Sequence, residues 1–162
     1  MRENKQYLAI LLLGLFCGLS LLPLQASATL SRNDGMQFLN AYQEALKNRS
    51  HEALNALIAG DARIRIDLED NNGPRQRFTI ARDRFIQQII ALWRFAHDQR
   101  QVFSNPQYSV SANGTLTLTV TQTEQRRLFG SDSGQKDILT MVLERRNGNI
   151  QIVDLHSISQ LW

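Results

Sequence analysis

The sequence predicts an α+β fold in which helices come first and a run of antiparallel strands follows. Two observations support this prediction. Apolar residues recur at helical spacing in much of the chain up to residue 97, whereas apolar and polar residues alternate along most of 102–159. Asn113-Gly114 and Asn147-Gly148 both stand between alternating segments, and Asn-Gly is typical of the two-residue turn of an antiparallel hairpin.

The N-terminal segment has the pattern of an export signal. The basic residues Arg2 and Lys5 precede the apolar run 8–22, and the segment closes on Ala26-Ser27-Ala28. The small residues suit the pocket of a signal peptidase, and the apolar run is short for a membrane span. We therefore expect cleavage after Ala28 and a periplasmic or secreted protein. The alternative is an uncleaved N-terminal anchor.

Cleavage of a signal peptide spanning residues 1–28 leaves residues 29–162 as one domain without a stable membrane span. The only cysteine, Cys17, is then removed, which excludes a disulfide or a thiolate metal site. The three histidines are far apart, and no phosphate-binding glycine loop appears, so neither a metal nor a cofactor is expected. The net charge is only +3 and its basic residues are scattered, which argues against a nucleic-acid partner.

Two helices are predicted at the start of the mature domain. Ser31 followed by Asp34 resembles a capping box, with Asp in place of the usual Glu or Gln. The buried stripe expected after this start comprises Met36, Phe38, Leu39, Tyr42, Ala45 and Leu46. Ser50 is expected to cap a second, short helix that Gly60 ends.

The middle of the chain predicts a strand, a turn and a long helix. Residues 61–68 alternate as a half-buried strand, and Asn71-Asn72-Gly73-Pro74 predicts a turn into a short strand at 78–80. Residues 81–97 follow as the longest helix of the mature chain. Its wide apolar stripe comprises Phe85, Ile86, Ile89, Ile90, Leu92, Trp93 and Ala96.

The last third predicts a meander of strands. Pro106 lies inside the strand 102–110, which must therefore be an edge strand or be bulged there. The strands that follow are 115–128, 137–146 and 149–159, with a looser turn at 130–134 and the tight turn at Asn147-Gly148. Glu124 and Arg126 extend an apolar face of their strand, either as an ion pair at the mouth of the interior or as an exposed strand end.

This order of elements resembles the nuclear transport factor 2-like superfamily, and within it the SnoaL-like and ketosteroid isomerase-like domains. Residues 42–50 and 53–64 look like the family's helix, turn, short helix and first strand, and 142–156 look like its last hairpin. The resemblance implies a cone-shaped, strongly curved antiparallel sheet wrapped around the N-terminal helices, a cystatin-like roll, in an exported bacterial member. It also implies a homodimer paired through the sheet, with the threonine-rich face of 115–123 as the candidate surface.

Only some of the catalytic positions of the family's isomerases have a suitable residue in this sequence. Tyr42 stands where the isomerases have a tyrosine that hydrogen-bonds the substrate oxyanion. The position of their general base falls on Ile66, which cannot transfer a proton, and the second acid is expected near residues 140–142, where none occurs.

Four polar residues remain candidates for catalysis or ligand binding. Tyr42 is either a core tyrosine or a ligand-binding group. His97 shares a predicted helix face with Trp93 and either enters a cavity or caps the helix end. Asp154 and His156 lie two apart on the last strand, where they form an acid–base pair if that side faces inward and are exposed if it does not.

The sequence therefore predicts an exported, non-catalytic domain that binds a small apolar ligand or an envelope protein. Its expected ligand-binding residues are Tyr42, Ile66, Trp93, His97 and His156. The alternative is a cofactor-free acid–base enzyme, of the isomerase, dehydratase or cyclase kind, acting on a small hydrophobic substrate. In that case Tyr42, His97, Asp154 and His156 supply the polar groups.

Overall fold

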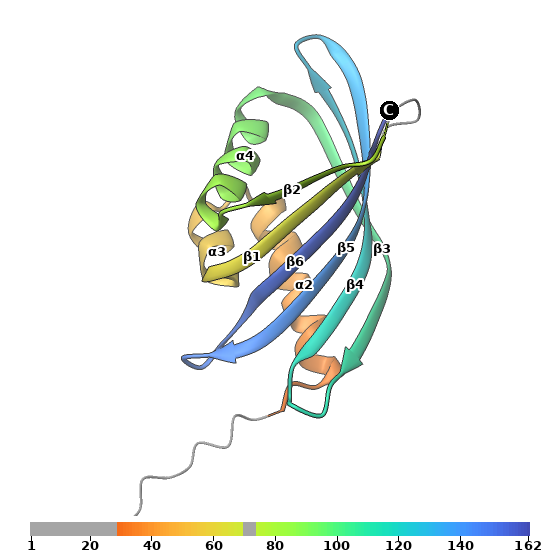
Figure 1. The fold of residues 1–162 in the computed structure, drawn as a ribbon. Helices are drawn as coiled ribbons and strands as arrows, with labels where there is room; N and C mark the ends of the chain where they lie inside the picture. Colours follow the sequence, from red (N-terminus) through yellow and green to blue (C-terminus); the bar gives the residue numbers. More distant parts are fainter. Residues whose placement is uncertain (1–28, 70–73) are drawn as a thin grey trace, which may run out of the picture.

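A computed structural model describes residues 29–69 and 74–162 (Figure 1). The predicted export signal and most of the predicted turn at 71–74 lie outside these residues. The elements are α2 (Arg32–Lys47), α3 (His51–Leu57), β1 (Ile58–Glu69), β2 (Gln76–Ile80), α4 (Arg82–Phe95), β3 (Ala96–Val110), β4 (Leu116–Leu128), β5 (Ser131–Arg146) and β6 (Asn149–Leu161). The α+β prediction is confirmed: a strongly curved sheet holds the helices on its concave side.

The sheet has six strands in the order β2-β1-β6-β5-β4-β3 within the described part of the chain. Four of the five neighbouring pairs are antiparallel, whereas β1 runs parallel to β6. The expectation of a purely antiparallel sheet is therefore wrong at this one pair. Alternation along a strand predicts its two faces but says nothing about the direction of a partner that is distant in sequence.

The first helix begins at the predicted cap. The Ser31 side chain accepts a hydrogen bond from the Asp34 N–H at 3.2 Å, and the Asp34 carboxylate accepts one from the Ser31 N–H at 2.8 Å. Together they satisfy two backbone donors that a helix start leaves free. The stripe predicted for α2 is buried except for Met36, whose exposed fraction is 48%.

Two helices end earlier than predicted because each passes directly into a strand. The short helix α3 stops at Leu57, and Gly60 lies inside β1 rather than at a helix cap. Likewise α4 stops at Phe95, so His97 lies on β3 and caps no helix. Ala96 already has the extended dihedrals φ −85° and ψ 127°. No glycine marks this second boundary in the sequence.

The predictions for the edge and the turns have mixed outcomes. Strand β3 is an edge strand, and its register also shifts between Ser104 and Gln107, around Pro106. The tight turn at Asn147-Gly148 is confirmed by φ values of 51° and 82°. The hairpin at Asn113-Gly114 forms, but through a five-residue loop, because Val110 pairs with Leu116.

The turn predicted at 130–134 is instead a two-residue turn, Phe129-Gly130, and β5 already begins at Ser131. Phe129 has φ 51° and Gly130 φ 86°, the left-handed pair that a type I′ turn needs. Phenylalanine is an unusual residue for this conformation. The side chain of Phe129 is also 85% exposed, and its only ring contact among the described residues is with Phe95, at 5.8 Å between centroids.

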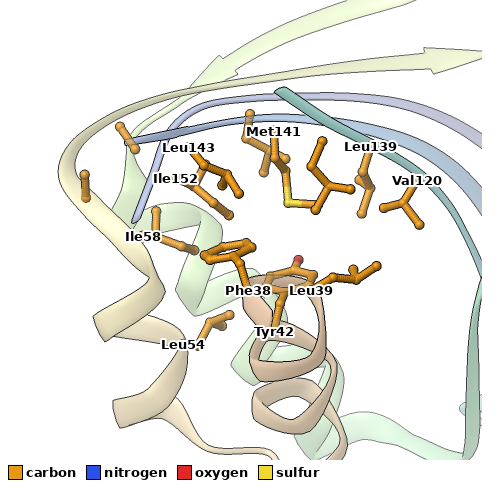
Figure 2. Packing of buried hydrophobic residues seen from close by; sticks show 14 of the residues in the cluster. Phe38, Leu39, Tyr42, Leu54, Ile58, Val120, Leu139, Met141, Leu143 and Ile152 are labelled. Carbon is orange, nitrogen blue, oxygen red and sulfur yellow. The ribbon is translucent and has the colours of Figure 1, made fainter. Parts of the chain in front are cut away.

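The core fills the part of the roll that α2 and α3 cover (Figure 2). Apolar side chains of both helices face the inner side of the sheet. The labelled members of this cluster are Phe38, Leu39, Tyr42, Leu54, Ile58, Val120, Leu139, Met141, Leu143 and Ile152. Among the described residues, no helix is long and apolar enough to span a membrane.

Replacing Phe129 by asparagine is expected to stabilise the domain. Asparagine tolerates the left-handed conformation that costs other residues about 1–2 kcal/mol, so we expect a gain of roughly 0.5–1 kcal/mol. The free energy of unfolding in urea measures this. The matched control is Asn147→Phe in the other two-residue turn, which should destabilise by a similar amount. No gain for Phe129→Asn would show that its contact with Phe95 offsets the strain.

Candidate functional site

A cavity of about 710 Å³ lies between α4 and the wide half of the curved sheet. Its apolar lining comes mainly from α4, the first two strands and the β4–β5 turn, and includes Phe78, Ile80, Phe85, Ile89, Leu92 and Phe129. Most of its polar lining comes from the four later strands, as Gln99, Gln101, Gln122, Glu124, Gln135, Asp137, Ser157 and Ser159, and α4 adds Arg84 and Gln88. The cavity is thus mainly apolar on the helix side and mainly polar on the side of the later strands.

The polar wall continues the inward faces of the strands. The buried positions of β4 are, in order, Leu118, Val120, Gln122 and Glu124. Those of β5 beside them are Met141, Leu139 and Asp137. Because side chains alternate along a strand, these polar residues point the same way as the core residues before them. The inner face of the sheet therefore changes from apolar under α2 to polar under α4.

Glu124 is buried, and both of its carboxylate oxygens accept hydrogen bonds. Its Oε1 accepts hydrogen bonds from Arg126 Nη1 at 2.5 Å and Gln99 Nε2 at 3.1 Å, and its Oε2 accepts one from Gln101 Nε2 at 3.0 Å. The side chains of Glu124 and Arg126 are 6% and 8% exposed. The ion-pair interpretation of these two residues is confirmed, and the exposed-strand alternative is wrong.

Asp137 is buried and forms no ion pair with any cationic side chain of the described residues. Its Oδ1 accepts hydrogen bonds from Gln135 Nε2 at 2.9 Å, Ser157 Oγ at 3.2 Å and Ser159 Oγ, whereas Oδ2 accepts only from Gln135, at 3.0 Å. Burial raises the pKa of Asp137, the three donors oppose this shift, and the charge of Glu124 adds to it. A carboxyl with a raised pKa in a cavity is the usual sign of a functional group.

The Tyr42 side chain closes the inner end of the cavity. It is 3% exposed, and its ring packs edge-on against Phe103 at 6.2 Å and stacks with Phe38 at 6.5 Å. Burial, together with the charges of Asp137 and Glu124, raises the pKa of Tyr42 above its usual value, so the hydroxyl keeps its proton. No hydrogen bond to this hydroxyl occurs within residues 29–69 and 74–162. Figure 2 shows its oxygen directed toward the sheet.

Only some of the predicted ligand-binding residues line the cavity. Tyr42, Ile66 and Trp93 do so, and their role in binding stays a prediction. His97 is exposed on β3 and does not line it, because α4 ends two residues earlier. His156 is absent from the lining as well, so the prediction that these two histidines face the cavity is wrong.

A β-bulge moves Asp154 and His156 to the outer face. Ile152 pairs with Leu143, but Asp154 pairs with the very next residue of β5, Val142, so β6 carries one extra residue there. After such an extra residue, each later position of the strand lies on the side opposite to the one that simple alternation predicts. The inward residues of β6 are therefore Ile152, Leu155, Ser157 and Ser159, and of the two alternatives for Asp154 and His156 the inward-facing acid–base pair is wrong.

On the outer face Asp154 binds two arginines and His156 lies beside Asp67. Asp154 accepts hydrogen bonds from Arg63 Nε at 2.6 Å and Arg65 Nη2 at 2.9 Å. His156 Nε2 lies 3.2 Å from Oδ2 of Asp67. Arg77 is the largest of several influences that lower the pKa of Asp67 to about 2. No three His, Cys, Asp or Glu side chains gather as a metal site in the part of the chain that the structure describes.

The sequence interpretation did not identify Asp137 or the polar wall around it, although the sequence contains a signal for Asp137. Asp137 lies two residues before Leu139 and four before Met141, on the side that alternation assigns to the core. An acid on a core face is the informative exception to the apolar pattern. Ser157 and Ser159 gave no comparable signal, because the bulge in β6 hides their direction.

Solved structures share this fold at low sequence identity, whereas no protein-family model and no curated protein matches the chain. An NTF2-like protein from Cytophaga hutchinsonii ATCC 33406 superposes with a TM-score of 0.60 at 14% identity, over 80% of this chain and 98% of that one. A protein with a cystatin-like fold from Caulobacter vibrioides gives 0.59 at 19% identity, over 78% and 88%. Hexachlorocyclohexane dehydrochlorinase LinA-type3 from Novosphingobium barchaimii LL02 gives 0.58 at 13% identity, over 78% and 84%.

These similarities confirm the predicted fold. The chain has the nuclear transport factor 2-like architecture, also described as cystatin-like, with an open, mixed sheet. At identities of 13–19% the likeness concerns the fold and leaves the chemistry of the cavity to this chain's own residues.

Replacing Asp137 by asparagine is expected to change how stability depends on pH. An acid whose pKa is raised by folding loses its proton first in the unfolded state, so the free energy of unfolding falls as pH rises above about 4 and levels off once the folded state also ionises. Asp137→Asn removes this fall, and the asparagine keeps a hydrogen-bonding group. Urea unfolding between pH 4 and 8 measures it. Parallel pH profiles for the two proteins would contradict the raised pKa.

Proposed function

We propose that this chain, which has the nuclear transport factor 2-like fold, is an exported, non-catalytic domain that binds a small, mainly apolar ligand in the cavity under α4. The observation that carries the proposal is the two-sided lining of the cavity. An apolar body can lie against α4 while a polar group meets the hydrogen-bonding wall of the sheet. Of the two partners expected from the sequence, the cavity supports the small ligand over an envelope protein.

The volume and exposure of the cavity support binding of a molecule rather than simple packing. A volume of about 710 Å³ lies within the range of small-molecule sites. At its margin the aromatic side chains of Phe78, Phe95 and Phe129 are 42%, 53% and 85% exposed. Exposed aromatic rings beside an apolar cavity would lose water-contacting surface when a ligand enters, which favours binding.

Export and dimerisation belong to the same proposal. Leu30 is 1% exposed, and its N–H donates a hydrogen bond to the Gly114 carbonyl at 3.2 Å, so cleavage after Ala28 would leave the packed domain whole. The outer face of the sheet carries no helix in Figure 1, and its threonine-rich part on β4 is the proposed homodimer surface.

Native mass spectrometry of the full chain expressed in a bacterium tests both points. We expect a mature protein that begins at Thr29, is recovered from the periplasm or the medium, and has twice the mass of one subunit. A cytoplasmic protein that retains Met1 would contradict export, and a monomer at micromolar concentration would contradict the dimer.

A cofactor-free acid–base enzyme is the second candidate, favoured by one observation. The Asp137 carboxyl, whose pKa is raised, and the protonated Tyr42 hydroxyl belong to the same cavity, which is the type of pair that proton transfer needs. A structural neighbour is named as a dehydrochlorinase, which makes the fold compatible with such chemistry. Recovery of a bound compound chemically unchanged after long incubation supports the binding function, and its conversion supports the enzyme.

A tryptophan introduced on α4 is expected to block the cavity. Ile89 lines it and is half-buried, so Ile89→Trp places the larger ring in the space that a ligand needs. We expect at least a tenfold loss of affinity for an apolar fluorescent probe, with the circular dichroism spectrum unchanged. Ile138→Trp is the matched control, because Ile138 lies on the outer face and is 43% exposed. Equal probe affinity in both variants would contradict binding in this cavity.

A further inference from the structure

The polar wall of the cavity contains more negative than positive groups. Glu124 and Asp137 contribute two carboxyls, and Arg126 contributes one guanidinium. Both terminal nitrogens of Arg126 are already used, Nη1 by Glu124 and Nη2 by Gln135 at 3.1 Å. Among the described residues, the only cationic side chain in the lining is that of Arg84, which is exposed on α4.

The two carboxyls of the wall have unused acceptor capacity, and the one fully buried donor of the wall that lacks a partner among the described residues is Arg126 Nε. Asp137 Oδ2 and Glu124 Oε2 each accept one hydrogen bond within the described chain, from Gln135 and Gln101, and each carboxylate oxygen can accept two. The Tyr42 hydroxyl has no partner there, and it too can accept. The Tyr42 side chain is more than nine-tenths buried and lines the same cavity. The negative charges of Asp137 and Glu124 both act on it.

We propose that the cavity selects ligands with a protonated amine at one end of an apolar body, and that Asp137, Glu124 and Tyr42 bind the ammonium group. This inference rests on the proposed binding function and names the class of ligand. An ammonium group has three N–H donors and one positive charge, which complement three acceptors and one unpaired carboxylate. The aromatic side chains of the cavity add favourable contacts with a cation.

The charge balance also excludes ligands of the opposite kind. A carboxylate or phosphate head would bring a further negative charge to a buried wall that already has two carboxyls and one guanidinium, whose Nη1 and Nη2 bind Glu124 and Gln135. A neutral alcohol can donate a hydrogen bond to one acceptor, but it does not compensate the negative charge of the Asp137 carboxylate. The expected order of affinity is therefore amine, then alcohol, then carboxylate.

Binding of an ammonium group should be coupled to the ionisation of Asp137. The charged or titratable groups that share the cavity with this carboxyl are Tyr42 from α2, Arg84 from α4 and Glu124 from β4, and Arg126 is linked to it only through Gln135. The other polar groups around it are amides and hydroxyls, and β1 and β2 contribute apolar residues to the cavity. Because the cation favours the carboxylate, amine affinity should rise with pH above about 4, where an ordinary aspartate titrates.

Titration calorimetry with three ligands of equal chain length tests the inference. The probes are decylamine, decanol and decanoate below their aggregation concentrations, added to the purified mature protein at pH 7. We expect decylamine to bind at least tenfold more tightly than decanol, and decanoate to bind most weakly. Asp137→Asn should lower the ratio of amine to alcohol affinity about tenfold, whereas Asp154→Asn on the outer face should leave it unchanged.

Two failures can be told apart. If all three probes bind equally, or if decanoate binds most tightly, the amine inference is wrong and the binding function stands. If none binds, the proposed function fails and the inference fails with it. A measurement on the unsubstituted protein covers the case in which Asp137→Asn does not fold: amine affinity should rise from pH 4 to pH 7 while decanol affinity stays constant. A flat amine profile overturns the inference.

Discussion

The packing of α2 against the concave face of the sheet determines where everything else in this domain lies. Phe38 and Tyr42 project from one stripe of that helix and fill the narrow part of the roll, where the strands supply only apolar side chains. Such a contact is favourable because it removes a large apolar area from water. Since α2 occupies that part, α4 alone covers the wide part, and the cavity forms beneath it.

The polar wall lowers the stability of the fold, so its presence needs an explanation other than core packing. Buried carboxyls cost stability unless each is hydrogen-bonded, and a chain that needed only a core would have placed apolar residues at these positions. Here amides and hydroxyls from three strands meet Glu124 and Asp137, and Arg126 links the two through Gln135. The network keeps two charged groups at defined positions inside an otherwise apolar roll.

Much of the fold could be predicted from the sequence because it depends on local patterns. The capping box at Ser31, the helical stripe of α2 and the turn at Asn147-Gly148 all need only neighbouring residues. The site was harder to predict. Tyr42 belongs to a helix stripe that the sequence shows, whereas the face of Asp154 stayed open because an extra residue in β6 has no signature of its own. The direction of β1 beside β6 likewise depends on distant pairing.

The bulge at Val153 has a consequence for how such a domain can diversify. The inner residues of β6 after that point are Leu155, Ser157 and Ser159, while the outer ones include Asp154, which arginines bind, and His156, which lies beside Asp67. Loss of one residue at Val153 would restore strict alternation, so either the part of the strand before it or the part after it would have to change sides. Deletion or insertion of a single codon can thus turn the ionisable side of β6 toward the cavity in place of the side that bears the serines. None of the side chains involved needs to change.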